Sequence, residues 1–236
     1  MNLKSAERRV MKNINDVCVV VQARLSSQRC PNKMLRDFAD TTLMDILLNK
    51  LVNSELPNSN IICSVFEPEL IEVCSKYPVR TFIRSERSAM SEGNPLTEIF
   101  EWWDRIPFKN VMMVSGCCPF IRKETIEKFF FDYLKSDNDG MFGVIEKKNY
   151  IWDNDGNLLT PFSTSMNTKE AQSLSEAAHC LYAGKLDDIG HNVWMGDLSK
   201  RGDVELWPVP ENETMDIDHE WQFELYETLY RSRKGD

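Results

Sequence analysis

The sequence predicts an α/β fold in which a mainly parallel β-sheet is flanked by helices. Short apolar runs rich in β-branched residues alternate along the chain with longer patterns of helical spacing. The first run, residues 17–23 (VCVVVQA), is apolar almost throughout, as in a strand that is covered on both faces. With 236 residues, 42% of them hydrophobic, the chain is long enough to bury such a sheet without disulfides or a structural metal.

The first half of the chain contains four pairs of a strand followed by a helix. Thr42 opens the first helix, with Asp45 placed for a capping box, and Pro68 is a favoured first residue of the second. Asn94 and Pro95 serve as N-cap and first residue of the third, which reaches Ile106. The expected strands are residues 17–23, 60–65, 79–84 and 111–115, and the fourth helix is expected over residues 123–135.

The pattern changes near residue 146, after a fifth strand at residues 141–145. Residues 150–159 (YIWDNDGNLL) indicate a hairpin that turns at Asp155 and Gly156, and a polar, irregular stretch follows. The alternation of strands and helices then resumes. The remaining elements are strands at residues 178–183 and 204–209 and a helix from His219 to about Arg231. We therefore predict one domain over residues 1–236 with an inserted arm of about residues 146–177.

The overall charge argues against nucleic acid as a partner. The 28 Lys and Arg residues against 37 Asp and Glu give a net charge of −9, which repels phosphate backbones. Seven cysteines without a C-x-x-C pair are typical of reduced thiols, and no apolar run is long enough to span a membrane. We therefore expect a cytoplasmic protein with no membrane partner.

One segment opposes the overall charge. Residues 17–36 contain no acidic residue but four basic ones, Arg24, Arg29, Lys33 and Arg36. Because ligands of open α/β sheets bind at the carboxyl ends of strands, this loop (ARLSSQRCPNK) suits a triphosphate. It is not a P-loop, since G-x-x-x-x-G-K-[ST] is absent. A solvated basic loop is the alternative interpretation.

A pair of aspartates precedes the last helix, in Met215-Asp216-Ile217-Asp218. In an extended backbone two residues at this spacing project to one face, so Asp216 and Asp218 can share a hard cation such as Mg²⁺. The alternative is that Asp218 only caps the helix that begins at His219. A cationic phosphate loop and a metal chelate in one domain are what phosphoryl or nucleotidyl transfer requires.

Three segments, VVVQARLSSQRCPNKML, GCCPFIRKETIEKF and MDIDHEWQFELYE, make the chain resemble the cytidylyltransferases that activate sugar acids. These are the acylneuraminate and deoxyoctulosonate cytidylyltransferases and their spore-coat polysaccharide relatives. The resemblance covers about residues 15–230. It implies a Rossmann-like nucleotidyltransferase fold and identifies the inserted arm with the family's dimerisation arm, so that a homodimer is expected.

The family pattern A-R-x-x-S-x-x-x-P-x-K is met by Ala23, Arg24, Ser27, Pro31 and Lys33. By resemblance, Mg²⁺ binds the terminal aspartates, and His179 faces the acceptor, although a buried structural histidine is an equal alternative. The implied nucleotide-binding residues are Ala23, Arg24, Ser27, Arg29, Lys33 and Arg84, and the implied catalytic residues are Arg24, Lys33, Asp216 and Asp218.

The chain departs from the family at Gly116-Cys117-Cys118-Pro119, where many relatives carry G-D-x-P with an acidic metal ligand. The expected function is transfer of CMP from CTP to an acidic sugar with release of pyrophosphate, for surface glycan biosynthesis. Two alternatives stay open. One is a glycosyltransferase that uses a nucleotide sugar and a D-x-D metal; the other is a nucleotide-binding protein without catalysis, since Cys117 replaces the acid.

Overall fold

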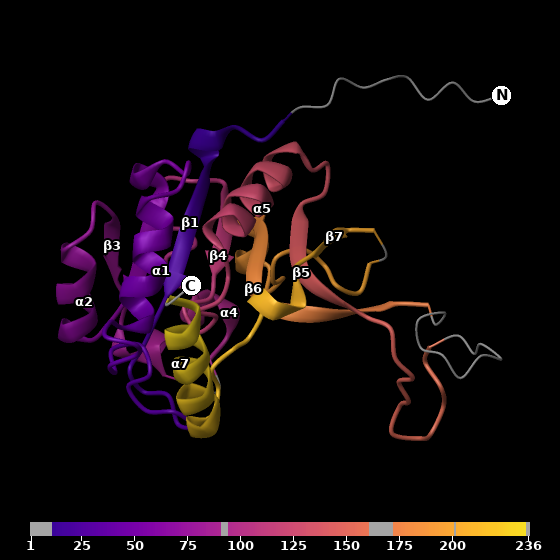
Figure 1. Cartoon of the computed structure of the whole chain (residues 1–236). Helices are drawn as coiled ribbons and strands as arrows, with labels where there is room; N and C mark the ends of the chain where they lie inside the picture. The colour runs from indigo at the N-terminus through magenta and orange to yellow at the C-terminus, as the bar shows by residue number, and fades with distance from the viewer. Residues whose placement is uncertain (1–10, 91–93, 161–171, 201, 235–236) are drawn as a thin grey trace.

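The structure is a computed structural model that describes residues 11–90, 94–160, 172–200 and 202–234. Within them, seven strands form one sheet in the order β3-β2-β1-β4-β6-β5-β7 (Figure 1). Only β6 runs against the others, so the prediction of a mainly parallel sheet is confirmed. The strands are β1 (Val17–Gln22), β2 (Ile61–Val65), β3 (Arg80–Ile83), β4 (Asn110–Val114), β5 (Gly140–Lys147), β6 (Leu174–Lys185) and β7 (Val204–Pro208).

The long helices begin where their capping signals indicate. Thr42 Oγ1 accepts a hydrogen bond from the Asp45 N–H at 3.0 Å, and Pro68 is the first residue of its helix. The α-helices are α1 (Leu43–Val52), α2 (Pro68–Ser75), α3 (Glu86–Ala89), α4 (Leu96–Ile99), α5 (Lys123–Lys135), α6 (Leu186–Gly190) and α7 (Glu220–Lys234). Short 3-10 helices occupy Ile14–Asp16, Asn58–Asn60 and Glu211–Glu213.

The helix expected to reach Ile106 is much shorter than predicted. It spans only Leu96–Ile99, because its C-cap residue, Phe100, has a φ of −110° and a ψ of 45°, which are not helical. Its N-cap is Pro95 and not Asn94 as predicted. The turns that follow place Trp102 in the core, where its indole N–H donates to Gln22 Oε1 at 2.9 Å. The apolar pattern of this segment therefore reflects burial of separate rings and not the face of one long helix.

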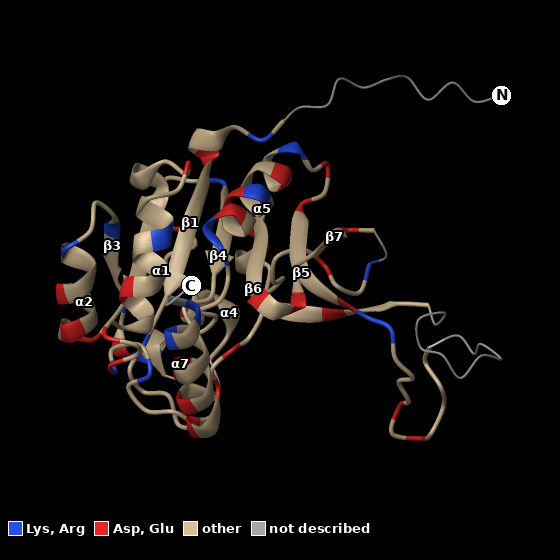
Figure 2. Ribbon diagram, viewed as in Figure 1, with Lys and Arg blue, Asp and Glu red and all other residues tan. Residues whose placement is uncertain are grey.

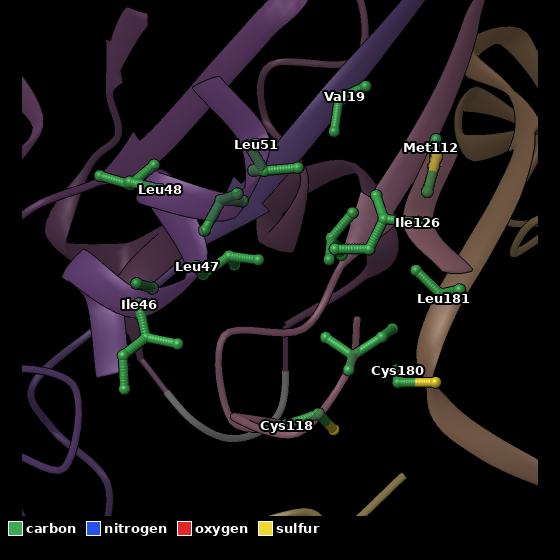
Figure 3. Close-up of a cluster of buried hydrophobic side chains, with 14 of the residues drawn as sticks. Val19, Ile46, Leu47, Leu48, Leu51, Met112, Cys118, Ile126, Cys180 and Leu181 are labelled. Carbon is green, nitrogen blue, oxygen red and sulfur yellow. The ribbon is translucent and has the colours of Figure 1, made fainter. Parts of the chain in front are cut away.

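The sheet has a core on each face, as the apolar sequence of β1 predicts. Val19 and its neighbours at alternate positions pack against α1 and α5, where Figure 3 shows Leu47, Leu51 and Ile126 around Val19 and Met112. Cys18 and Val20 point to the opposite face and belong to the cluster that contains Trp102. Because successive side chains of a strand point to opposite faces, both faces of β1 are buried, and its residues from Val17 to Val21 are all apolar.

The predicted arm begins within β5 and ends within β6, which pair antiparallel from Met141 and Ala183 to Lys147 and Leu174. Residues 148–160 extend away from the sheet (Figure 1). The predicted hairpin is present, since Trp152 pairs with Leu158 and Gly156 has a φ of +84° at the turn. The rest of the arm includes residues 161–171, which lie outside the described residues.

All seven cysteines are free thiols, and six of them are buried. In the part of the chain that the structure describes, no helix combines the length and the apolar character needed to cross a bilayer.

Gly140, at the start of β5, lies against the backbone of the segment that precedes β7. A Cβ at this position would stand 2.0 Å from the Met195 carbonyl oxygen, which is fixed backbone. We expect Gly140→Ala to lower the free energy of unfolding by about 3 kcal/mol, because the strand and the segment must separate. Urea unfolding measures the change. Gly156→Asn is the matched control: no atom lies within 4 Å of a Cβ there, and Asn tolerates a positive φ, so a large loss in this variant would contradict the packing argument.

Candidate active site

The loop after β1 forms one side of a cavity at the carboxyl end of the parallel strands. The cavity has a volume of about 360 Å³, within the range of sites for small ligands. Five of the six residues expected to bind nucleotide lie on it, together with one of the two predicted metal ligands. The lining consists of Gln22, Ala23, Arg24, Ser27, Gln28, Arg29, Lys33, Met34, Cys117 and Asp218.

Neighbouring segments hold the backbone of this loop and the Arg24 side chain in place. The Leu25 N–H donates to Glu67 Oε1 at 2.6 Å, and Arg24 donates to the Ala89 carbonyl at 3.3 Å. Glu67 is a residue to which the sequence analysis assigns no role. Its position one residue before α2 places the carboxylate against the loop, so Glu67 supports the basic segment without lining the cavity.

Lys33 connects the loop to the aspartate segment near the C-terminus. Its side chain is buried, its ammonium donates to the Ile217 carbonyl, and it lies 3.6 Å from Asp218 Oδ1. Burial acts to lower the pKa of Lys33, but Cys117, Asp216 and Asp218 raise it above its usual value. The ammonium is therefore charged at neutral pH.

Two further arginines contact the aspartate segment and the first residue of α7. Arg29 Nη2 lies 2.9 Å from Asp218 Oδ1, and Arg36 Nη1 lies 2.6 Å from Glu220 Oε1. Figure 2 shows the basic loop after β1 near the acidic beginning of α7. Asp218 therefore faces two cations, Arg29 and Lys33. The backbone N–H groups of Asp218 and His219 both donate to Gln222 Oε1 at 2.8 Å, so Gln222 caps this end of α7 and the Asp218 carboxylate does not.

Asp216 has the features of a cation ligand. Its Oδ1 atom is buried and has no hydrogen-bond partner, a costly state for a carboxylate oxygen without a cation. Burial, and then the charge of Asp218, raises the pKa of Asp216. Among the described residues no three His, Cys, Asp or Glu side chains are arranged as a metal site. The pair therefore fits a hard cation that takes its other ligands from phosphate oxygens and water, as Mg²⁺ does.

Arg84 and His179 lie apart from the loop lining. Arg84 is buried behind the loop, donates to the Ala23 carbonyl at 2.8 Å, and has a pKa lowered to about 10 by burial. It positions the loop and does not line the cavity. His179 is exposed on an irregular stretch of β6 with a φ of +52°, and its Nδ1 lies 2.8 Å from the Tyr182 hydroxyl. Its charge acts to lower the pKa of Asp216, so it lies on the aspartate side.

Cys117 is a lining residue to which no role was assigned from the sequence. Its carbonyl accepts a hydrogen bond from the Ile217 N–H at 2.9 Å, which holds the aspartate segment against the end of β4. Burial raises the pKa of its thiol, although Lys33 opposes this effect. The side chain is therefore a neutral thiol at the position where many relatives carry an acid.

Beyond the aspartates lies a second hollow, of about 590 Å³. Asp218 lines both this hollow and the loop cavity, so a ligand in either space would reach its carboxylate. The hollow is lined by Ile145, Glu211, Asn212, Thr214, Met215, Asp216, Asp218, Gln222 and Tyr226.

Two curated proteins resemble parts of this chain. An uncharacterized protein of Methanocaldococcus jannaschii, MJ1063, is 25% identical over 135 residues, which are 56% of this chain and 51% of that protein. The spore coat polysaccharide biosynthesis protein SpsF of Bacillus subtilis is 23% identical over 117 residues, 48% of each chain. The matches span about half the length of these relatives.

Solved structures of low identity share the fold. A CMP:2-keto-3-deoxy-manno-octonic acid synthetase in complex with CTP superposes with a TM-score of 0.67 at 12% identity, covering 92% of this chain and 99% of that one. A 4-diphosphocytidyl-2C-methyl-D-erythritol synthase of Anaerococcus prevotii gives a TM-score of 0.64 at 14% identity, covering 92% and 96%. The Rossmann-like nucleotidyltransferase fold implied by the sequence resemblance is therefore confirmed.

The sequence model of the family described as Cytidylyltransferase matches residues 18–181, more than half of the chain and the part that contains the basic loop. This match shows that the chain belongs to the cytidylyltransferase family.

Proposed function

We propose that this protein transfers CMP from CTP to a hydroxyl group of an acidic sugar and releases pyrophosphate, with Mg²⁺ as cofactor. The observation that carries the proposal is the meeting of opposite charges at one cavity. Arg24, Arg29 and Lys33 line it from the loop after β1, and Asp218 lines it from the segment before α7. A triphosphate needs the first group, and its metal needs the second.

The basic residues act together in this proposal. Arg24 and Lys33, with Arg29 beside them, neutralise the triphosphate and the negative charge that grows on the departing pyrophosphate. Ser27 and the loop backbone supply hydrogen-bond donors to the same oxygens. Because Lys33 is buried and bound to Ile217, its ammonium is held in place before the substrate arrives.

Asp216 and Asp218 would hold Mg²⁺. When bound, the ion supplies positive charge that polarises the phosphoryl group and orients the oxygens around it. Asp218 lines both the nucleotide cavity and the hollow beyond it, and Asp216 lines the hollow, from a segment fixed by Lys33 and by the Cys117 carbonyl. In the reaction the sugar hydroxyl oxygen bonds to the α-phosphorus of CTP. The bond between the α-phosphorus and the oxygen that bridges it to the β-phosphorus breaks, pyrophosphate leaves, and the hydroxyl proton passes to solvent. We assign no general base, since positioning and electrostatics suffice for this chemistry.

The acceptor is proposed to bind in the hollow beyond Asp218. Its described lining contains three carboxylates, Glu211, Asp216 and Asp218, and no Lys or Arg. The carboxylate of an acidic sugar would therefore depend on the metal, on His179, or on Lys147, which contacts Glu211. The names of the spore coat and octonic acid relatives support a sugar acid as acceptor and a role in surface glycan synthesis. A cytoplasmic homodimer formed through the arm belongs to the same proposal.

Pyrophosphate release distinguishes the proposal from its alternatives. We expect release from CTP and Mg²⁺ with at least one acidic sugar, and none with the neutral sugar of the same carbon skeleton. Transfer from a nucleotide sugar would instead identify a glycosyltransferase. Tight CTP binding without release by any acceptor would identify a nucleotide-binding protein.

Asp216→Asn should lower turnover at least about a hundredfold, because the isosteric amide keeps the shape but loses the charge for the cation. Removing a buried, unpaired carboxylate should not reduce the thermal midpoint. Steady-state pyrophosphate release and calorimetric titration of Mg²⁺ in the presence of CTP measure the effect. Asp104→Asn, on an exposed turn, is the control and should match the unmodified protein. Full turnover in Asp216→Asn would refute the metal site.

Lys33→Ala should weaken CTP binding about tenfold to a hundredfold, the loss expected for one or two charge-assisted hydrogen bonds. Titration calorimetry with CTP gives the dissociation constant. Lys76→Ala removes the same charge from an exposed position after α2 and should leave it unchanged. Equal affinities in the two variants would contradict the assignment of Lys33 to the phosphates.

A further inference from the structure

A third cavity, which shares no lining residue with the other two, lies between α1, the beginning of α5 and the end of α7. Its volume is about 400 Å³, and four of its lining residues are basic whereas one is acidic. Figure 2 shows blue segments on these three helices near the C-terminus. The lining consists of Lys50, Pro119, Phe120, Ile121, Arg122, Lys123, Glu124, Tyr230 and Arg233. A concentration of cations at one cavity is unexpected in a chain with a net charge of −9.

Lys50 is the central cation of this cavity. Its Nζ donates to the Pro119 carbonyl at 2.5 Å, and no acidic side chain in the described part of the chain forms an ion pair with it. Burial lowers the pKa of Lys50 to about 8, although Cys118 and Glu213 oppose the shift. A half-buried ammonium without a counter-ion is costly, and an anion in the cavity would remove that cost.

Arg233 is the second cation without a carboxylate among the described residues. Its guanidinium lies over the Phe120 ring, 4.7 Å from the centroid, so an aromatic face and not an acid holds it at the cavity. The other two cations are already neutralised in part. Arg122 pairs with Glu213 at 2.6 Å, and Lys123 lies 3.7 Å from Glu127.

We infer that this cavity is a second anion site, which binds the phosphate group of a small molecule separately from the nucleotide cavity. Two unpaired cations match the charge of a phosphate near neutral pH. Its oxygens accept hydrogen bonds from several directions, and here the donors come from different helices. The first turn of α5 adds backbone N–H groups, since the side chain of its N-cap residue, Arg122, accepts no hydrogen bond from them. The site does not depend on the proposed catalytic function.

Inorganic phosphate is the probe, titrated into the ¹⁵N-labelled full-length protein and followed by amide chemical shifts. We expect the amides of residues 120–124 to shift and saturate. Because Lys50 contributes a charge-assisted hydrogen bond, Lys50→Met should weaken this binding about tenfold or more. Lys135→Gln removes a charge from the exposed far end of α5 and should leave the affinity unchanged.

Shifts confined to the loop after β1, with none at residues 120–124, would overturn the inference. The same holds if Lys50→Met binds phosphate as tightly as the unmodified protein. If Lys50→Met does not fold, Arg233→Gln tests the inference instead, because Arg233 is exposed in the last turns of α7 and its loss should not affect the core. Weaker phosphate binding in this variant would support the inference, and unchanged binding would overturn it.

Discussion

The contact between Lys33 and the segment Met215-Asp216-Ile217-Asp218 is the interaction on which the site depends. The ammonium donates to the Ile217 carbonyl and lies 3.6 Å from Asp218 Oδ1, so it joins the loop after the first strand to a segment near the end of the chain. Neither half works alone. In the proposed function the loop supplies cations for the phosphates but no metal ligand, and the aspartates supply ligands for the metal but no cations for the phosphates.

This contact also explains how a protein of net negative charge can present a site for an anionic nucleotide. Positive charge is gathered in a loop that contains no acidic residue. Glu67 and Arg84 fix its backbone from outside, and the Ala89 carbonyl holds the Arg24 side chain. Asp216 and Asp218 then lie among Lys33, Arg29 and His179. The buried Asp216 Oδ1 atom has no hydrogen-bond partner, which destabilises the folded state locally. A cation bound at this position would remove the destabilisation.

Cys117 marks how this chain differs from relatives with an acid at the same position. Its side chain is a neutral thiol on the cavity, and its backbone carbonyl still holds Ile217. The two terminal aspartates therefore carry the negative charge at the proposed metal site.

The sequence by itself determined the α/β class, the strands of the sheet and the residues of the basic loop. These depend on local patterns: apolar runs such as β1, capping residues such as Thr42, and a motif in which Arg24, Ser27 and Lys33 have fixed spacing. The prediction of a helix that reaches Ile106 was wrong, because an apolar pattern does not distinguish one helical face from separately buried rings such as Trp102.

Only the tertiary structure decided which residues meet. It placed Arg84 behind the loop and not on its lining, and directed the Asp218 carboxylate to Arg29 and Lys33 while Gln222 capped α7. It also brought Lys50 and Arg233 to one cavity. Contacts between residues so far apart in the sequence follow from the order of strands and the packing of helices on them, which no local pattern encodes.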